Sequence, residues 1–261
     1  MEPGLVNLHS SESGQGPPVV LLHGLFGAGS NLGALARSLR DRYRVFSLDL
    51  PNHGRSQWQE DSSLAAMTAT LVNWLDASST PQALFVGHSL GGKLAMQLAL
   101  THPQRVKALV VADIAPVTYE PRHDAVFKAL DAVAAAQCTS REEAATIMSA
   151  HLDESGVVQF LLMSLRAEGD GVYRWRFNLE GIKRNYAAVR LPPGPGNPFT
   201  GPAQFVKGGE SNYILPEHRA EVLRLFPAAQ MKVMPGCGHW LHVEQPSLFN
   251  GIVGRFLDAV E

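Results

Sequence analysis

Short apolar runs alternate with amphipathic stretches along much of this chain, and this alternation limits the possible folds more than any other feature. The stretches between the runs have apolar residues at helical spacing, over 31–40, 64–77 and 90–101. The runs themselves have the length and composition of buried strands, at 19–22, 44–48, 83–86 and 108–111. The order strand, helix, strand, helix favours right-handed crossover connections. We therefore predict an α/β fold with a mostly parallel, doubly wound sheet.

The alternation breaks off in the middle of the chain and resumes near its end. From 116 to 200 the strand pattern largely vanishes, and helical periodicity appears at 125–136, 141–152 and 157–165. Strand-like and helix-like segments return at 203–207, 217–225, 230–234 and 245–259. We expect 1–115 and 201–261 to form one core domain and 116–200 to be an inserted helical cap. Such a cap would cover the carboxyl ends of the strands, where open α/β sheets bind ligands.

Composition and charge argue against several classes of protein. The formal net charge of -2 and the lack of a Lys/Arg run argue against a nucleic-acid partner. The start, Met1 to Val6, lacks a secretory pattern, and no run of about 18 apolar residues follows, so we expect a cytoplasmic protein without a membrane span. Cys138 and Cys237 are too few for a disulfide framework, and no Cys/His cluster has zinc-ligand spacing. We expect free thiols and no metal.

The sequence GHSLG at 87–91 stands between a predicted strand and a predicted helix, the context in which G-x-S-x-G has chemical meaning. A sharp turn there forces the central residue into strained backbone angles and leaves no room for side chains at the flanking glycines. The amides at the start of the helix would point toward an anion forming beside the serine. We predict Ser89 as a nucleophile and the backbone N–H of Leu90 as an oxyanion donor.

A second oxyanion donor is predicted from HGLFG at 23–27, which follows the first predicted strand. A glycine-rich turn at this point can present a backbone N–H to the same anion from the other side, and Leu25 is the candidate. His23 and His53 are expected to stabilise their own turns.

The general base is predicted from GCGHW at 236–240, which follows the last predicted strand. A histidine in this loop stands at the same sheet edge as Ser89, so His239 is the best placed of the ten histidines. His242 remains an alternative, although its neighbours are typical of the approach to the final helix.

These motifs, HGLFG, DLPNHGRS, GHSLGG and GCGHWLHVEQP, resemble those of the α/β-hydrolase fold-1 superfamily over nearly the whole chain. Within it, HGLFG with SNLG, VADIAPV at 111–117, WRFNL at 175–179 and FVKGG at 205–209 are similar to segments of the YbfF-type bacterial esterases and their mitochondrial ABHD-eleven-like relatives. The resemblance implies hydrolysis of short acyl esters or thioesters.

The acid of a Ser-His-Asp set has two candidates. Many relatives carry it as G-x-x-D after the penultimate strand, but GGES at 208–211 places Ser211 at that position and Glu210 one residue earlier. Asp113, at the carboxyl end of the strand near 108–112, resembles the acid of the YbfF-like subgroup. A carboxylate there can accept a hydrogen bond from the histidine Nδ1–H and fix its tautomer. We prefer Asp113 and keep Glu210 as the alternative.

The expected activity is that of a serine carboxylesterase acting on short- to medium-chain acyl esters through an acyl-enzyme, without a cofactor. A small-molecule acyl ester would be its partner, and the chain would be a monomer or a homodimer. An acyl-CoA thioesterase and a non-catalytic hydrolase-fold binding protein remain alternatives. Candidate substrate contacts are Phe26, His88, Trp175, Arg176, Phe177 and Trp240.

Overall fold

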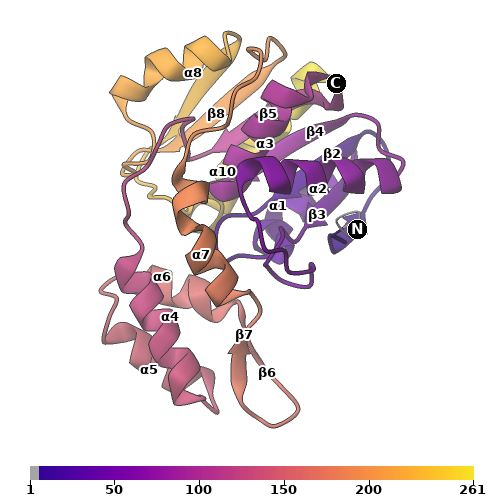
Figure 1. Ribbon diagram of the computed structural model, residues 1–261. Coiled ribbons are helices and arrows are strands. Elements are labelled where there is room, and N and C mark those ends of the chain that lie inside the picture. Colours follow the sequence, from indigo (N-terminus) through magenta and orange to yellow (C-terminus); the bar gives the residue numbers. More distant parts are fainter. Residues whose placement is uncertain (1–5) are drawn as a thin grey trace.

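A computed structural model describes residues 6–261, and a mostly parallel sheet forms its centre (Figure 1). Residues 1–5, part of the N-terminal stretch compared above with a secretory pattern, lie outside the described residues. The sheet has seven strands in the order β1-β3-β2-β4-β5-β8-β9, and only β1 runs antiparallel to its neighbour. The predicted sheet is confirmed. Its strands are β1 Ser10–Ser13, β2 Pro18–Leu22, β3 Arg44–Leu48, β4 Ala83–His88, β5 Val106–Ala112, β8 Ala203–Gly208 and β9 Ala229–Met234.

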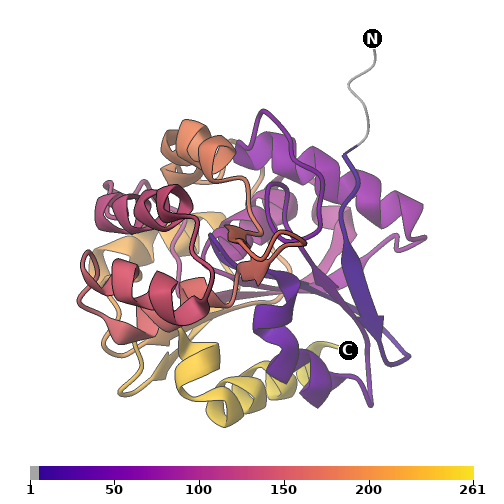
Figure 2. The same ribbon diagram turned by 90° about the horizontal axis from the view of Figure 1, so that it is seen from below.

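Helices cover both faces of the sheet (Figure 2). One face packs on α1 (Gly33–Leu39) and α10 (Pro246–Val260), preceded by the short α9 (Leu241–Glu244). The other face packs on α2 (Leu64–Ala77), α3 (Leu90–Thr101) and α8 (Arg219–Leu225). The buried side chains of the two faces form two separate clusters, as a doubly wound fold requires.

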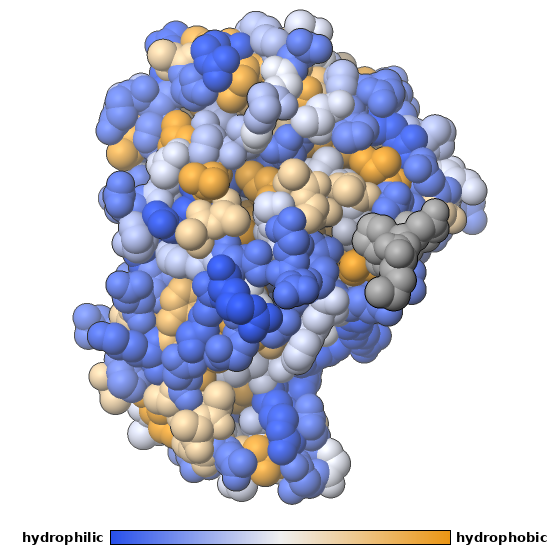
Figure 3. Space-filling view, in the orientation of Figure 1, coloured by the Kyte–Doolittle hydropathy of each residue, from blue (hydrophilic) through white to orange (hydrophobic). Residues whose placement is uncertain are grey.

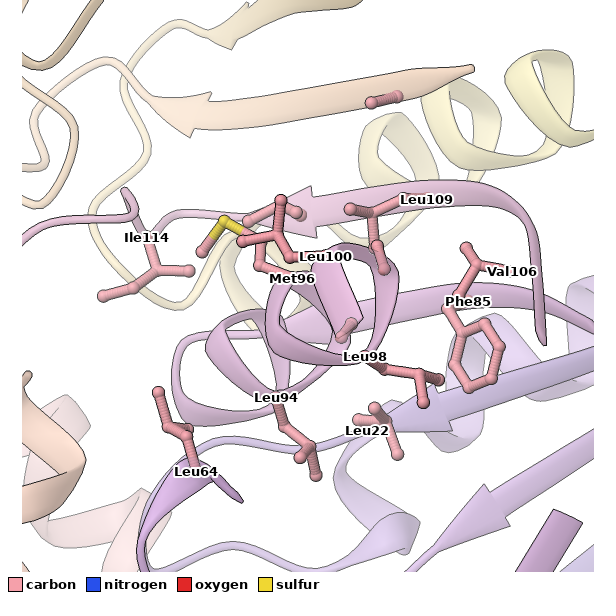
Figure 4. Packing of buried hydrophobic residues seen from close by; sticks show 14 of the residues in the cluster. Leu22, Leu64, Phe85, Leu94, Met96, Leu98, Leu100, Val106, Leu109 and Ile114 are labelled. Carbon is pink, nitrogen blue, oxygen red and sulfur yellow. The ribbon is translucent and has the colours of Figure 1, made fainter. Parts of the chain in front are cut away.

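The helix α3 is buried along almost its whole length, from Leu90 to Leu100. Figure 4 shows Leu94 and Leu98 on the side of Leu22 in β2, while Met96 and Leu100 lie on the side of β5. A helix that is enclosed on all sides is fixed by packing rather than by its intrinsic propensity. The first turn of α3, which follows Ser89, is therefore held in one position.

The segment between β5 and β8 projects from one end of the sheet (Figure 1) and has a buried cluster of its own, which Phe26 joins. The helices predicted there are present, although the third ends at Leu162 because Leu165 begins a strand. Sequence analysis missed a hairpin and a fourth helix. The elements are α4 Asp124–Ala136, α5 Arg141–Ser149, α6 Ser155–Leu162, β6 Leu165–Ala167, β7 Tyr173–Trp175 and α7 Leu179–Arg190.

Hydrophilic residues dominate the face drawn in Figure 3, and its apolar residues lie in scattered patches. None of the helices within residues 6–261 is both long and apolar enough to cross a membrane. Both cysteines are buried and unpaired.

Candidate active site

Ser89 occupies the sharp turn between β4 and α3 with φ 53° and ψ -117°. A positive φ is uncommon and strained for a residue with a side chain. The turn is possible because Gly87 and Gly91 flank it: a Cβ at Gly87 would lie 2.3 Å from the carbonyl oxygen of Gly91, and one at Gly91 would lie 2.2 Å from that of Leu22. The backbone thus needs both glycines, for the reason anticipated from the motif.

The glycine-rich turn after β2 lies directly against the serine. A Cβ at Gly24 would be 3.2 Å from the Cβ of Ser89. Among residues 6–261, the amide of Leu25 has no hydrogen-bond acceptor. The amide of Leu90 is the first of α3, where no intrahelical acceptor exists, and it also has none elsewhere in these residues. Two unused donors therefore flank Ser89, the arrangement expected for an oxyanion hole.

Two buried histidines hold this turn in place. His23 accepts a hydrogen bond from the Leu50 amide at 2.9 Å and donates one to the Gly24 carbonyl at 2.7 Å. His53 accepts one from the Phe26 amide at 3.1 Å. Burial lowers the pKa of His23, and it lowers the pKa of His53 to about 3. Both rings are therefore neutral near pH 7 and structural, as expected from the sequence.

His239 follows β9 and meets Asp113, which follows β5. Its Nδ1 lies 2.8 Å from Oδ2 of Asp113, whose side chain is completely buried. The carboxylate also accepts hydrogen bonds from the amide of Gly208 at 3.0 Å and from the hydroxyl of Ser211. Glu210 is exposed. The carboxylate that reaches the imidazole is that of Asp113, and this bond leaves Nε2 of His239 free to face a substrate or a serine.

Ser89, Asp113 and His239 stand at the same edge of the sheet, because each follows the carboxyl end of a parallel strand. No hydrogen bond joins Ser89 Oγ to His239 within the described part of the chain. Catalytic hydrogen bonds are often long or poorly aligned without substrate and tighten in the complex.

Ser211 is the site residue that sequence reasoning did not place. Its hydroxyl donates to Asp113 and accepts a hydrogen bond from the Tyr213 amide at 3.2 Å. The signal was present, because Ser211 occupies the position at which many relatives carry the acid. A hydroxyl there orients the carboxylate instead of replacing it.

His88 lies beneath the base rather than beside a substrate. Its side chain is buried, and its Nε2 donates to the backbone carbonyl of His239 at 2.9 Å. Burial lowers the pKa of His88 well below its ordinary value, so the ring is neutral. In the structure this residue supports the His239 loop, and a contact between His88 and a substrate stays a prediction. His242 is also buried, and its ring packs 4.5 Å from that of His88, so it does not occupy the place of the base.

Three aromatic residues predicted as substrate contacts pack inside the insertion. The side chains of Phe26 and Phe177 are 3% and 2% exposed, and their ring centroids are 5.4 Å apart. Trp175 stacks on Phe177 at 5.3 Å and donates its indole N–H to the Leu130 carbonyl at 3.0 Å. Phe26 and Phe177 belong to the buried cluster of this segment, and the partly buried Trp175 packs against it.

Of the other two predicted contacts, Trp240 lies near His239, and Arg176 has no polar contact with the site among residues 6–261. The ring centroid of Trp240 is 5.7 Å from that of His239 and also 5.7 Å from that of Phe160, so Trp240 lies beside the base. Arg176 follows β7, where its amide donates to the Ser164 carbonyl at 2.8 Å. Within residues 6–261, no hydrogen bond or ion pair joins the Arg176 side chain to the residues of this site.

One known protein family matches most of the chain. Residues 17–246 match the model of the alpha/beta hydrolase fold. The chain belongs to the α/β-hydrolase family. Within the described residues of this α/β-hydrolase, no group of three or more His, Cys, Asp or Glu side chains is arranged to hold a metal ion.

Several α/β-hydrolases resemble the chain over most of its length. Esterase YbfF of Escherichia coli (strain K12) is 39% identical, over 92% of this chain and 93% of the relative. The sn-1-specific diacylglycerol lipase ABHD11 of Mus musculus is 38% identical, over 92% of this chain and 81% of the relative. A solved structure described as a marine microorganism esterase superposes with a TM-score of 0.93 at 34% identity, over 96% of this chain and 99% of the other.

A narrow cavity in this α/β-hydrolase adjoins both candidate oxyanion residues. It has room for about one water molecule. Its polar side chains are largely paired with each other: Asn52 bonds to Ser62 at 2.6 Å, and the Ser62 amide bonds to Asn185 at 2.9 Å. The remaining lining is mainly apolar. The lining residues are Leu25, Pro51, Asn52, His53, Ser62, Met67, Leu90, Ile182, Asn185 and Val189.

Proposed function

We propose that the protein is a serine carboxylesterase acting on short- to medium-chain acyl esters, with Ser89 as nucleophile, His239 as base and Asp113 as acid. The observation that carries the proposal is the 2.8 Å contact between His239 Nδ1 and the buried Asp113 carboxylate, at the sheet edge where Ser89 stands in a strained turn. The esterase names of YbfF and of the marine structure support the same class of reaction.

The reaction would proceed by acyl transfer. His239 Nε2 takes the proton of Ser89 as Oγ attacks the ester carbonyl, and the amides of Leu25 and Leu90 stabilise the resulting oxyanion. Asp113 holds the tautomer and stabilises the imidazolium. His239 then gives the proton to the leaving alcohol, which leaves an acyl group on Ser89. Water repeats the sequence, releasing the carboxylic acid and the free serine.

The cavity beside Leu25 and Leu90 supports the position of the acyl site, because it adjoins both candidate oxyanion donors. Its mainly apolar walls suit an alkyl group, which would have to push the lining apart to enter. Ile182 and Val189 of its lining come from α7. The insertion 116–200 would thus act as a cap that closes the acyl site and selects chain length.

Hydrolysis of a p-nitrophenyl ester series from acetate to palmitate tests the proposal, with wild type and Ser89→Ala measured side by side. We expect the wild type to cleave the short esters fastest and the alanine variant to fall by orders of magnitude toward background. A folded wild type that is inert across the series would contradict the esterase proposal. Equal rates for the two proteins would remove Ser89 from the mechanism.

A further inference from the structure

A stack of three flat groups ends on the ring of His239. The Tyr213 ring lies nearly parallel to the imidazole, with centroids 3.8 Å apart and planes 16° apart. The guanidinium carbon of Arg122 lies 4.8 Å from the centroid of the same tyrosine ring. Because the imidazole covers one face of the phenol at contact distance, the guanidinium takes the opposite face. The order is therefore His239, Tyr213, Arg122.

Hydrogen bonds fix the backbone of Tyr213 and the side chain of Arg122. The Tyr213 amide donates to Ser211 Oγ at 3.2 Å, and the Tyr213 carbonyl accepts from the Tyr119 hydroxyl at 2.6 Å. Arg122 Nη1 donates to Asn212 Oδ1 at 3.1 Å. The Tyr213 backbone, from which the ring reaches the imidazole, and the Arg122 guanidinium are therefore both anchored.

We propose that Tyr213 is a positioning residue for His239 and that Arg122 opposes part of its electrostatic effect, an inference that rests on the proposed function. The phenol fixes the plane of the imidazole, so that Nδ1 stays on Asp113 while Nε2 faces Ser89. The negative face of an aromatic ring also attracts a cation, which stabilises the imidazolium formed when the serine proton is transferred. The Arg122 charge on the other face repels the same imidazolium.

The other histidines and the tyrosine packed around His239 are neutral over the pH range of interest, and a second carboxylate, that of Glu244, accepts hydrogen bonds from the amides of Gly238 and Trp240 beside it. Burial lowers the pKa of His242 and of His123 to about 4 and that of His88 well below its ordinary value, so the three rings are neutral at pH 6 and above. Burial raises the pKa of Tyr213, so the phenol is also neutral. Asp113 supplies the negative charge opposite Nδ1.

The pH dependence of ester hydrolysis tests the two roles separately. Tyr213→Leu should lower kcat about tenfold with little change in KM, and move the acid limb of kcat/KM to lower pH by about half a unit. Tyr213→Phe keeps the ring, so its kcat and the position of its acid limb should both be close to those of the wild type. Arg122→Met should move the acid limb the other way, to higher pH, by about 0.2 to 0.4 unit. Opposite directions are the signature of an electrostatic stack.

A matched control and a second variant keep the test decisive. Tyr173→Leu removes a phenol from β7, away from the base, and should leave the acid limb where the wild type has it. The inference is overturned if the acid limbs of Tyr213→Leu and Arg122→Met coincide with that of the wild type or move together. If Tyr213→Leu fails to fold, the acid limb of Arg122→Met still tests the inference, because Arg122 is exposed and its replacement should leave the fold intact. Wild type that lacks all esterase activity would instead defeat the proposed function.

Discussion

At the scale of single residues, the site depends on how the buried carboxylate of Asp113 is satisfied. Three donors converge on it: the Gly208 amide, the Ser211 hydroxyl and Nδ1–H of His239. A buried charge is tolerated only when it is paired and hydrogen-bonded, and here the third donor is the imidazole itself. The carboxylate therefore determines which nitrogen of His239 carries the proton.

Replacement of this charge tests that role. In Asp113→Asn the amide can present an N–H to Nδ1, so the ring would hold its proton on Nε2 and could not accept one from Ser89. We expect kcat to fall by about 10³ to 10⁴ with little change in the fold. Glu210→Gln is the matched control, because that exposed carboxylate should be dispensable. A larger loss in Glu210→Gln than in Asp113→Asn would contradict the choice of acid.

The sequence located Ser89, Asp113 and His239 because each follows a strand of a parallel sheet, and such residues meet at one edge. Ser211 and Tyr213 were not recognised, since their contacts depend on the path of the loop after β8, for which no short pattern exists. The packing of Phe26, Trp175 and Phe177 on one another was not predicted either, because the surroundings of an aromatic ring depend on packing partners far away in the chain.

At the scale of elements, α7 joins the insertion to the core at both of its ends. At its start, the Asn178 side chain caps the Gly181 amide at 2.9 Å, and the Asn178 amide donates to the Asn52 carbonyl at 2.9 Å. At its end, Lys93 of the buried helix α3 donates to the last carbonyls, those of Val189, Arg190 and Leu191, at 3.3, 2.7 and 2.6 Å. A donor is favourable there because the last carbonyls of a helix have no intrahelical partner, and burial lowers the pKa of Lys93 to about 7.

Removal of the Lys93 amine, which donates to these carbonyls, should loosen this end of α7. Lys93→Met leaves buried carbonyls without donors, and we expect a loss of about 1 to 3 kcal/mol in the free energy of unfolding. Backbone amides near 186–191 should exchange with deuterium faster. Lys183→Met, on the same helix but in exposed ion pairs, should cost less than about 1 kcal/mol. Equal effects of the two substitutions would argue against a bridge between α3 and α7.

Long elements with strong periodicity were predicted to within a few residues, whereas short or polar ones were not. The edge strand β1 has the sequence SSES, which has no apolar alternation, and the β6–β7 hairpin has strands of three residues. The helix α7 did have a helical signal, with Ile182, Tyr186 and Val189 on one face. Polar residues surround this face, so the segment as a whole is not typical of a buried helix.

At the scale of the whole molecule, buried neutral histidines link stability to pH. Burial lowers the pKa of His53 to about 3 and that of His123 and His242 to about 4 in the folded state. In the unfolded chain each histidine has its ordinary pKa of about 6.5, so between about pH 4 and pH 6.5 the unfolded chain binds more protons than the folded chain. The free energy of unfolding therefore rises with pH across this range. The stability that the neutral buried histidines provide is therefore fully present above about pH 6.5 and is lost as the pH falls toward 4.

Urea unfolding between about pH 7.5 and pH 4.5 measures this linkage. We expect the free energy of unfolding to fall by several kcal/mol over that range, since a shift of two units is worth about 3 kcal/mol for each histidine. His242→Phe should flatten the curve, because this ring packs beside Phe249 and its Nδ1 has no hydrogen-bond partner among the described residues. A wild type equally stable at both ends of the range would contradict the account.

The overall architecture was accessible from sequence because strand and helix periods repeat along the core. The position of the insertion on the core was not, since it depends on contacts such as that between Asn178 and Asn52, which lie far apart in the chain. The narrow cavity beside Leu25 could not be predicted for the same reason, because its walls come from four separate segments: Leu25, 51–67, Leu90 and 182–189.

The central claim is that Ser89 is an activated nucleophile, and reaction with a fluorophosphonate tests it most directly. Intact-protein mass spectrometry should show one adduct on the wild type, located by peptide mapping to the segment that contains Ser89. The folded Ser89→Ala variant should show none. A folded wild type that stays unlabelled, or a Ser89→Ala variant labelled as fast as the wild type, would contradict the account.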